Sequence, residues 1–197
     1  MKKLFISIST LLVLLVSGCA TSTPTVKEVS DVKSGEEYTK LAEQYLKKKD
    51  KARAIKSSTK ACDLNDGKGC FIIGMFFESG EGVKEDYLKA SKYYKKGCDL
   101  NNNLACWRLG QFYYHGKKGI KEDFRKAEKY LKKSCSMKTP AACTKLGTLY
   151  CKGGNGVKGD YSKGMKYIKK GCDLGDSGAC SMYNMVNKYG KEKVIIR

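Results

Sequence analysis

The chain has 197 residues and a formal net charge of +19, because 39 Lys and Arg residues outnumber 20 Asp and Glu residues. Its ten cysteines stand beside a single histidine, His115, and this excludes the zinc sites of metallo-hydrolases, which need several histidines. The length suits one domain with its own hydrophobic core, and we expect no metal and no cofactor.

The first residues predict export and lipid attachment. A short basic start precedes residues 4–16, an apolar run of about a dozen residues that is too short to cross a bilayer but suits a signal peptide. The run ends in "VSGC", which resembles the bacterial lipobox, in which the cysteine is lipidated. We therefore predict a lipoprotein signal over residues 1–18, lipidation of Cys19 and a flexible tether over residues 19–35. The alternative is an ordinary signal peptide with an incidental cysteine.

The residue after the predicted lipidation site bears on the location. Ala20 stands where an Asp would mark retention in the enterobacterial inner membrane. We therefore expect a protein that is anchored through Cys19 in the bacterial cell envelope. The outer membrane is favoured over the inner one, with the domain on its periplasmic face or at the cell surface.

The positive charge has two interpretations. It favours contact with anionic surfaces such as phospholipid headgroups, lipopolysaccharide or nucleic acid, although an exported protein seldom meets nucleic acid and we expect no such partner. Lysine pairs also recur at repeated helical positions, which is typical of a solvated face: Lys95-Lys96, Lys132-Lys133 and Lys169-Lys170. The charge therefore identifies no partner by itself.

The rest of the chain repeats. Cys62, Cys98, Cys135 and Cys172 are 36, 37 and 37 positions apart, a period that is typical of solenoid proteins. In each unit a Cys-x-x-(Ile/Leu)-Gly-x-x-(Phe/Tyr) segment places apolar residues on one face of a first helix, helix A. A glycine-containing turn and an Asp then precede a second helix, helix B.

Two sets of residues recur at fixed places in these units. A small residue in helix A lets the partner helix approach closely: Ala42, Gly74, Gly110 and Gly147. An Asp stands at the N-cap of helix B: Asp86, Asp123 and Asp160. We therefore predict an all-α fold, an α/α solenoid in which four disulfide-linked helix pairs and a C-terminal capping helix form a tetratricopeptide-like right-handed superhelix.

The repeat domain is expected over residues 36–190, after the signal and tether. Its four units cover about 36–66, 67–102, 103–138 and 139–176, followed by the capping helix at 177–190 and a basic tail at 191–197. The first unit has a shorter turn between its two helices and resembles an N-terminal cap.

Eight cysteines form four pairs with the same spacing. The first cysteine of each pair ends helix B and the second lies in the first turn of the next helix A, so the two face one another around a short turn. Zinc sites favour Cys-x₂₋₄-Cys and redox pairs favour Cys-x-x-Cys, and neither spacing fits these pairs. Disulfides also persist in exported proteins. The predicted bridges are Cys62–Cys70, Cys98–Cys106, Cys135–Cys143 and Cys172–Cys180.

Cys151 remains without a partner in this scheme. It ends helix A of the fourth unit, where Glu78 and Tyr114 stand in earlier units. One interpretation is a small, half-buried residue, and the other is a free thiol that forms an intermolecular bridge.

The repeated segments resemble a known family. The pattern (Ala/Gly)-Cys-x-x-Leu-Gly-x-x-Tyr, Gly-x-Gly-Val-x-x-Asp and Lys-Ala-x-x-Tyr-Tyr-x-Lys-(Ala/Gly)-Cys resembles Sel-like repeats. With the added Cys-x₇-Cys pairs it is similar to the Helicobacter cysteine-rich protein family over about residues 36–185. The chain departs from that family in the extra Cys151, in Gly164 where Ala is usual, and in its lipoprotein-like N-terminus.

The resemblance implies an activity, since some members of the family bind penicillin and are described as weak β-lactamases. Serine β-lactamases combine Ser-x-x-Lys with Ser-Asp-Asn and Lys-Thr-Gly. Here Ser-x-x-Lys occurs at residues 57–60 and 30–33 without either other motif, and Lys60 also belongs to the repeated lysines. A His115–Cys151 nucleophilic pair is conceivable. No catalytic residue is assigned, and β-lactam hydrolysis stays an alternative implied by resemblance alone.

A binding surface is easier to predict. In tetratricopeptide-like solenoids the A helices line a concave groove, through the positions three before and one, four and five after the small residue. Aromatic and Met side chains are enriched at recognition sites, although packing between helices is the alternative. The predicted groove residues are Phe71, Met75, Glu78, Ser79, Trp107, Gln111, Tyr114, His115, Thr144, Thr148, Cys151 and Lys152.

These features together predict a lipid-anchored envelope protein that binds a protein, peptide or peptidoglycan-like partner in its concave groove. The alternatives are a β-lactam-binding or β-lactam-hydrolysing enzyme, and a secreted or surface factor that contacts a host. The oligomeric state is not predicted.

Overall fold

The computed structural model describes residues 34–189, and it is helical throughout this range except for its turns. The helices are α1 (Gly35–Lys47), α2 (Lys51–Asp63), α3 (Gly67–Ser79), α4 (Tyr87–Asp99), α5 (Asn103–His115), α6 (Phe124–Ser136), α7 (Pro140–Lys152), α8 (Tyr161–Asp173) and α9 (Ser177–Tyr189). The predicted all-α fold is confirmed. The predicted signal peptide, Cys19, the tether and the C-terminal tail lie outside the described residues.

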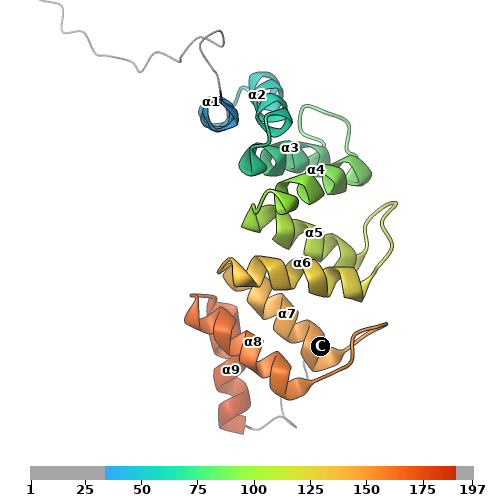
Figure 1. The fold of residues 1–197 in the computed structure, drawn as a ribbon. Coiled ribbons are helices and arrows are strands. Elements are labelled where there is room, and N and C mark those ends of the chain that lie inside the picture. Colours follow the sequence, from blue (N-terminus) through green and yellow to red (C-terminus); the bar gives the residue numbers. More distant parts are fainter. Residues whose placement is uncertain (1–33, 190–197) are drawn as a thin grey trace, which may run out of the picture.

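The helices form a stack of antiparallel pairs that runs from α1 at one end to α9 at the other (Figure 1). We call α1, α3, α5, α7 and α9 the A helices, and α2, α4, α6 and α8 the B helices. Long loops join each later A helix to its B helix along one edge of the stack, whereas short turns join each B helix to the next A helix. Among like helices of neighbouring pairs, α1 packs on α3 and α3 on α5 most extensively, which places the A helices on the inner side of the stack.

The B helices begin where the sequence predicts. Asp86, Asp123 and Asp160 are the N-cap residues of α4, α6 and α8, and each carboxylate accepts a hydrogen bond of 2.9 Å from the backbone N–H three residues later. Such a bond satisfies one of the N–H groups that the first helical turn leaves unpaired.

The small residues of the A helices permit the close packing that was predicted for them. A Cβ atom at Gly74 would lie 2.6 Å from the ring of Tyr94, and one at Gly147 would lie 2.6 Å from Cγ1 of Ile168. Both distances are too short for a real contact. The core therefore depends on a B-helix side chain that fills the space above each glycine.

Aromatic pairs also join the two helices of each later hairpin. Rings three residues after the small residue of helix A stack on a tyrosine of helix B, with centroids 5.5 to 5.8 Å apart: Phe77 on Tyr93, Tyr113 on Tyr130 and Tyr150 on Tyr167. A lysine from the first turn of each B helix lies over the same A-helix ring: Lys89, Lys126 and Lys163. The edge of each hairpin is thereby closed by stacking and cation–π contacts.

Each of the four predicted disulfides is present. The Cα atoms of the bridged cysteines are 4.4 to 4.7 Å apart, across the short turn between a B helix and the next A helix. The bridges therefore connect successive hairpins covalently, and the predicted stack of disulfide-linked helix pairs is confirmed. Cys151 is a free, half-buried thiol.

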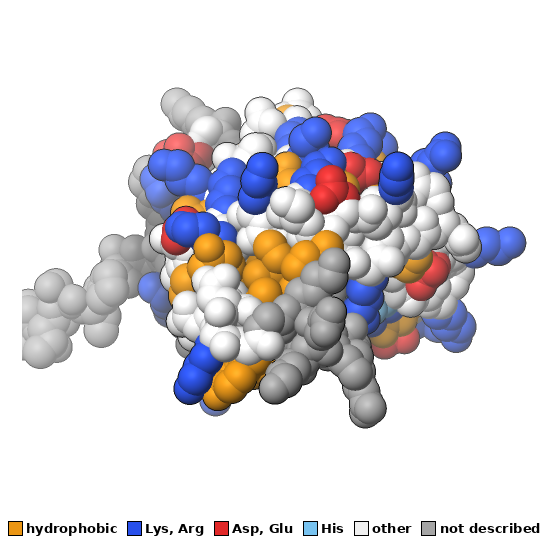
Figure 2. Space-filling model, turned by 90° about the horizontal axis from the view of Figure 1, so that it is seen from below, with side chains coloured by type: hydrophobic (Ala, Val, Ile, Leu, Met, Phe, Trp, Pro, Cys, Tyr) orange, Lys and Arg blue, Asp and Glu red, His pale blue; other side chains and the backbone are white. Residues whose placement is uncertain are grey.

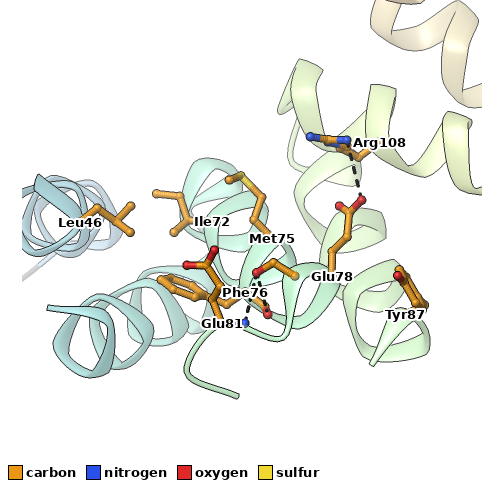
Figure 3. Close-up of a pocket in the computed structure, with 9 residues that line it drawn as sticks. Leu46, Ile72, Met75, Phe76, Glu78, Glu81, Tyr87 and Arg108 are labelled. Atoms are coloured by element: carbon orange, nitrogen blue, oxygen red, sulfur yellow. Dashed lines mark hydrogen bonds and ion pairs between the residues drawn. The ribbon is translucent and has the colours of Figure 1, made fainter. Parts of the chain in front are cut away.

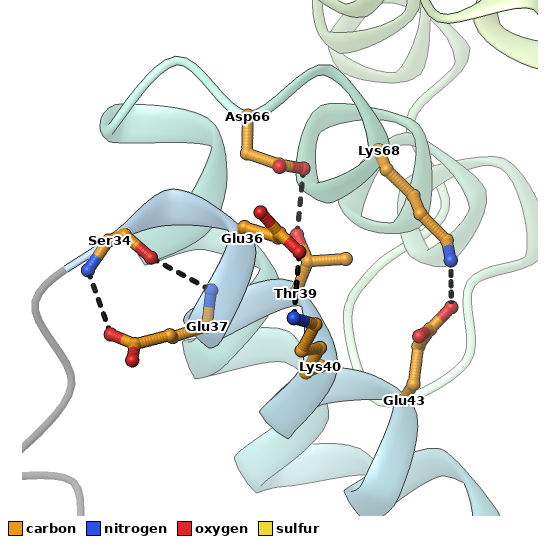
Figure 4. Close-up of polar contacts among 8 residues, drawn as sticks. All are labelled: Ser34, Glu36, Glu37, Thr39, Lys40, Glu43, Asp66 and Lys68. Atoms are coloured by element: carbon orange, nitrogen blue, oxygen red, sulfur yellow. Dashed lines mark hydrogen bonds and ion pairs between the residues drawn. The ribbon is translucent and has the colours of Figure 1, made fainter.

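Polar contacts at the helix ends align neighbouring hairpins (Figure 4). Ser34 and Glu37 form a capping box at the start of α1. The Thr39 hydroxyl of α1 donates a 2.8 Å hydrogen bond to Asp66, the N-cap residue of α3. Thr144 of α7 makes the equivalent 2.7 Å bond to Asp176, just before α9.

The two ends of the stack differ from its middle. Seen from its α9 end, the molecule exposes hydrophobic side chains (Figure 2), and Met185 and Tyr189 of α9 are about half exposed.

Within residues 34–189 no helix is long and apolar enough to cross a membrane, and no cluster of His, Cys, Asp or Glu in this range could hold a metal ion.

Candidate functional site

A cleft of about 430 Å³ lies on the A-helix side of the stack, between α1, α3 and α5 (Figure 3). Three of the predicted groove residues line it: Met75, Glu78 and Ser79. The other lining residues are Leu46, Ile72, Phe76, Glu81, Tyr87 and Arg108. The cleft joins an apolar part near α1 to a charged part near α5.

The apolar part of the cleft is exposed. Leu46 of α1 and Met75 of α3 expose 40% and 41% of their surfaces, although both are large hydrophobic side chains. Ile72 and Phe76 of α3 are buried and form the floor. Folding leaves this surface uncovered, so a ligand with an apolar side chain would gain free energy by covering it.

The charged part of the cleft is held in place by two helices. The carboxylate of Glu78 accepts a 2.5 Å hydrogen bond from the Tyr94 hydroxyl of α4, and it lies 3.8 Å from the guanidinium of Arg108 in α5. Burial, and next the hydrogen bond to Glu78, raise the pKa of Tyr94, so this phenol remains a proton donor. Glu78 is therefore a fixed acceptor beside a cation.

Arg108 connects the cleft to Trp107. Its guanidinium carbon lies 4.8 Å from the centroid of the Trp107 ring, and its Nε is buried without a hydrogen-bond partner among the described residues. The indole Nε1 of Trp107 is likewise buried and unpaired within the described part of the chain. Both nitrogens are enclosed by the protein, so the part of Arg108 that faces the cleft is the end of its guanidinium group beside Glu78.

The position three before the small residue faces the next hairpin. Phe71 is half-buried and lies 5.9 Å from the Tyr94 ring, and Trp107 is half-buried against the core between α6 and α7. Thr39 and Thr144 occupy the same position and bond to N-cap residues of the following A helix, as described above. Neither Phe71 nor Trp107 lines the cleft, so ligand binding through either one stays a prediction.

Tyr114 and His115 lie further along the stack, outside the cleft. The half-buried ring of Tyr114 packs 5.5 Å from Phe124 and lies under the ammonium group of Lys145, and burial raises its pKa. His115 is exposed, and partial desolvation together with the positive charges of Lys145 and Lys117 lowers its pKa. Since the lowered pKa keeps the imidazole neutral, His115 is a weaker base than an ordinary histidine.

The remaining predicted groove residues are spread over α5 and α7. Gln111, Thr144 and Thr148 are half-buried, and Lys152 is exposed. The hydroxyls of Thr144 and Thr148 donate to backbone carbonyls one turn earlier in α7, and Thr144 also bonds to Asp176. These hydroxyls are thus used within the fold.

Cys151 faces the neighbouring helix α8. Its Sγ lies 4.0 Å from the backbone oxygen of Tyr161, and burial followed by the charge of Asp160 raises its pKa. A thiol of raised pKa is a poor nucleophile, because the thiolate is the reactive form. The Ser57 side chain of the Ser-x-x-Lys match is buried in α2. Neither residue has the environment of an activated nucleophile.

Two cleft residues could have been found from the sequence, and one could not. Leu46 stands four residues after Ala42, so the positional rule that identified Glu78 would have identified it in the first unit. Tyr87 directly follows Asp86, the N-cap residue of α4 that the sequence predicts. Arg108 stands two residues before Gly110, a position that the rule does not assign to the groove, and the sequence gives no signal for its role.

Comparisons with known families agree with this architecture. The Sel1 repeat profile matches residues 67–102, 103–138 and 140–176. HcpD of Helicobacter pylori, whose name refers to a β-lactamase, is 40% identical over 53 residues, which are 27% of this chain and 17% of that protein. Beta-lactamase HcpA of the same bacterium is 42% identical over 50 residues, 25% of this chain and 20% of that protein. The matched segments thus span a fifth or less of these two relatives.

Solved structures share the same stack of helices. A Sel1 repeat protein from Oxalobacter formigenes superposes with a TM-score of 0.74 at 24% identity, over 83% of this chain and 69% of that one. Cysteine-rich protein B of Helicobacter pylori superposes with a TM-score of 0.53 at 34% identity, over 66% of this chain and 92% of that one.

Proposed function

Since this chain belongs to the Sel1 repeat family and is of its Hcp type, we propose that it is a cell-envelope scaffold that binds an extended peptide segment in the cleft between α1, α3 and α5. The segment could be carried by a protein or by peptidoglycan. Stacked helical repeats present extended surfaces suited to such ligands. The observation that carries the proposal is the uncovered apolar surface of Leu46 and Met75 beside the Glu78–Arg108 pair.

The cleft suggests what the peptide contributes. A large apolar side chain would cover Leu46 and Met75. Backbone amides or a basic side chain would donate to Glu78, and a carbonyl or carboxylate would accept from Arg108. Apolar contact supplies most of the free energy of such binding, while fixed polar groups set the orientation of the ligand.

The location of the scaffold forms part of the proposal. The signal peptide and the lipidation of Cys19, both predicted from the sequence, support a protein attached to the membrane by lipid. The mass of the native protein tests this, since processing before Cys19 and acylation of this residue change it by known amounts. Native protein that retains residues 1–18 or carries an unmodified Cys19 would contradict the anchor.

Two relatives carry β-lactamase in their names. That activity is said of those proteins. Ser57 is buried and Cys151 has a raised pKa, so no described side chain favours a hydrolytic function over peptide binding in this chain.

Peptide selection tests the cleft directly. The full chain carrying Cys19→Ser would be used to select binders from a phage library of random heptapeptides, and the affinity of the strongest one would be measured by fluorescence anisotropy. Met75→Glu should lower the affinity for that peptide about tenfold, because a buried apolar contact is worth more than 1 kcal/mol at an interface.

Leu88→Glu is the matched control, since Leu88 is equally apolar and 50% exposed but lies in α4, outside the cleft. Its affinity should stay within about twofold of the unsubstituted chain. Circular dichroism checks that both variants are folded. Peptides that bind the Met75→Glu variant unchanged would refute the cleft as their site.

A further inference from the structure

The positive charge of the described helices is concentrated on one side of the stack. The four B helices contain 17 Lys and Arg residues against four Asp and Glu residues. The five A helices contain seven against four. The sequence left open whether this charge faces solvent or an anionic partner; in the structure most of the helical charge belongs to the B helices, whereas the peptide cleft lies between A helices.

The basic residues form three columns along this surface, which we call the B-helix face. The columns are Arg53, Lys89, Lys126 and Lys163; Lys56, Lys92, Lys129 and Lys166; and Lys60, Lys96, Lys133 and Lys170. Within a helix the three positions are separated by three and four residues, so they share one side of it. Figure 2 shows Lys and Arg side chains around much of the outline of the molecule, most densely along its upper edge, while hydrophobic side chains gather nearer the centre of this end.

The columns differ in how many of their positive charges are paired with a carboxylate of the protein. Three members of the first column pair with the N-cap Asp of their own helix, at 2.5 Å for Arg53, 3.8 Å for Lys89 and 3.0 Å for Lys126. In the middle column Lys56, Lys92, Lys129 and Lys166 are exposed, and none has an ion-pair partner among the described residues. This column keeps its charge available.

The surface is open along α6, whereas at α2 a pocket of about 560 Å³ brings Arg53, Lys56 and Lys60 next to Tyr38 and Tyr45 of α1. A shallow depression of about 600 Å³ on α6 is lined by Arg125, Lys129, Lys132 and Lys133 together with Glu128 and Ser136. Three tyrosines of the B helices, Tyr93, Tyr130 and Tyr167, stack on rings of the A helices, which covers one face of each. Proteins that bind single-stranded nucleic acid offer successive free aromatic faces to the bases, and these three rings are not free in that way.

We propose that the B-helix face binds the anionic phospholipid headgroups of a bilayer, with the middle lysine column as its centre. An array of uncompensated lysines that extends over four helices suits a diffuse layer of phosphates, and each lysine near such a layer contributes to binding. The proposed anchor at Cys19 would hold the domain within reach of the membrane, and only this proximity rests on the proposed function. Docking through the B helices turns the cleft of the A helices away from the lipid, toward a peptide partner.

Vesicle flotation tests the face without the anchor. The full chain carrying Cys19→Ser would be mixed with vesicles of phosphatidylcholine alone or with about a third of phosphatidylglycerol. Its apolar N-terminal segment is the same in every arm, so a preference for anionic vesicles reports charge. Lys92→Glu, Lys129→Glu and Lys166→Glu together should weaken binding to the anionic vesicles about a hundredfold, since each lysine contributes about fivefold.

The control reverses three exposed lysines outside the B helices: Lys47→Glu, Lys118→Glu and Lys188→Glu. It changes the net charge equally and should weaken binding less than about tenfold. The B-helix variant should stay folded, because each new carboxylate stands four residues before a lysine, an order that stabilises helices. Circular dichroism checks this.

Three outcomes would overturn the proposal. Equal losses in the two triple variants would mean that net charge, not this face, attracts the membrane. Equal binding to both kinds of vesicle would exclude a role for headgroup charge. Tighter binding to a 20-base-pair DNA duplex than to the anionic vesicles, lost in the same B-helix variant, would assign the face to nucleic acid.

Discussion

The hairpins α3–α4 and α7–α8 have the same construction but present different surfaces. Each begins after a disulfide, has a glycine where its helices approach most closely, and starts its B helix with an Asp cap. They differ at the position four residues after the glycine. Glu78 stands there in α3 and Cys151 in α7.

The side chain that helix B places beside this position determines its polar contacts. In α4, Tyr94 fills the space above Gly74 and reaches Glu78 with its hydroxyl, so the carboxylate is fixed at the mouth of a cleft. In α8 the equivalent residue is Ile168, which fills the space above Gly147 but has no polar atom to offer.

In the α7–α8 hairpin the side chain at this position, Cys151, instead packs against α8 of the same hairpin. Gly164 takes the place of Ala90, and a Cβ there would lie 2.4 Å from Sγ of Cys151 and 2.7 Å from the backbone oxygen of Gly147. The departures from the family pattern at Cys151 and Gly164 are therefore one feature, since the thiol occupies the space that the missing methyl group leaves. The repeated residues build the stack, and a few variable positions give each hairpin its surface.

The largest effect should be the same in both hairpins. Replacing both cysteines of Cys62–Cys70 with Ser, or both of Cys135–Cys143, should each lower the free energy of unfolding by roughly 2.5 kcal/mol, because each bridge closes a loop of about nine residues. Both bridges are fully buried, with Cα distances of 4.4 and 4.7 Å. Urea denaturation measures the loss.

The equality of the two losses is the critical result. Both double variants retain Cys151, so thiol exchange affects them alike. Losses that differ by more than about 1 kcal/mol would show that the two hairpins already differ in their shared construction, beyond the uncertainty of such measurements.

Gly164→Ala should separate the two hairpins. The added methyl group would contact a sulfur atom and a backbone oxygen, and we expect a loss of about 2 kcal/mol in the free energy of unfolding. The reverse change Ala90→Gly in α4 should cost about 2 kcal/mol, from helix propensity and the loss of a fully buried methyl group rather than from a clash. Thermal or urea denaturation of the two variants gives the comparison.

The double variant identifies which contact matters. Adding Cys151→Ala to Gly164→Ala removes the sulfur, and it should recover about half of the loss, since the backbone oxygen of Gly147 remains. A Gly164→Ala chain that is more stable than the unsubstituted one would mean that α8 can move away from α7, and that the two departures are independent.

The sequence predicts the shared construction better than the cleft. Helices, caps and disulfides follow from local rules of period and spacing, and Asp86 or Cys98 has the same function wherever the unit recurs. The cleft forms between hairpins, so its residues depend on how far one unit is rotated relative to the next. The positional rule therefore finds Met75 and Glu78 but cannot find Arg108, which reaches the cleft from a neighbouring hairpin.

The same limit explains the position three before the small residue. A rule taken from other solenoids places Phe71 and Trp107 in the groove. Here Phe71 packs against Tyr94 of its own hairpin and the core shared by α4 and α5, and Trp107 packs against the core of α6 and α7. The threonines at equivalent positions bond to Asp66 and Asp176, and ligand binding through Phe71 or Trp107 stays a prediction. Only the rotation between units, which no short motif encodes, distinguishes a groove from an interface between repeats.

The smallest expected effect concerns the hydroxyl that distinguishes α4 from α8. Tyr94→Phe should lower the free energy of unfolding by about 1 kcal/mol at neutral pH, because Glu78, whose side chain is 21% exposed, keeps Arg108 as a partner and some access to water. It should also change how the free energy of unfolding depends on pH above 10. Burial and the bond to Glu78 raise the pKa of Tyr94 above its ordinary value of 10.0.

The sign of that response follows from proton linkage. Above pH 10 the unfolded chain loses the Tyr94 proton while the folded chain keeps it, so the contribution of this phenol is complete below pH 10 and falls as the pH rises. The unsubstituted protein should therefore lose stability more steeply between pH 10 and 11 than Tyr94→Phe. Glu78→Gln should keep most of the steep slope, because burial is the larger cause of the raised pKa. Urea denaturation across this range checks the order, and a Tyr94→Phe chain with the same slope as the unsubstituted protein would show that the phenol is not enclosed in α3–α4 as described.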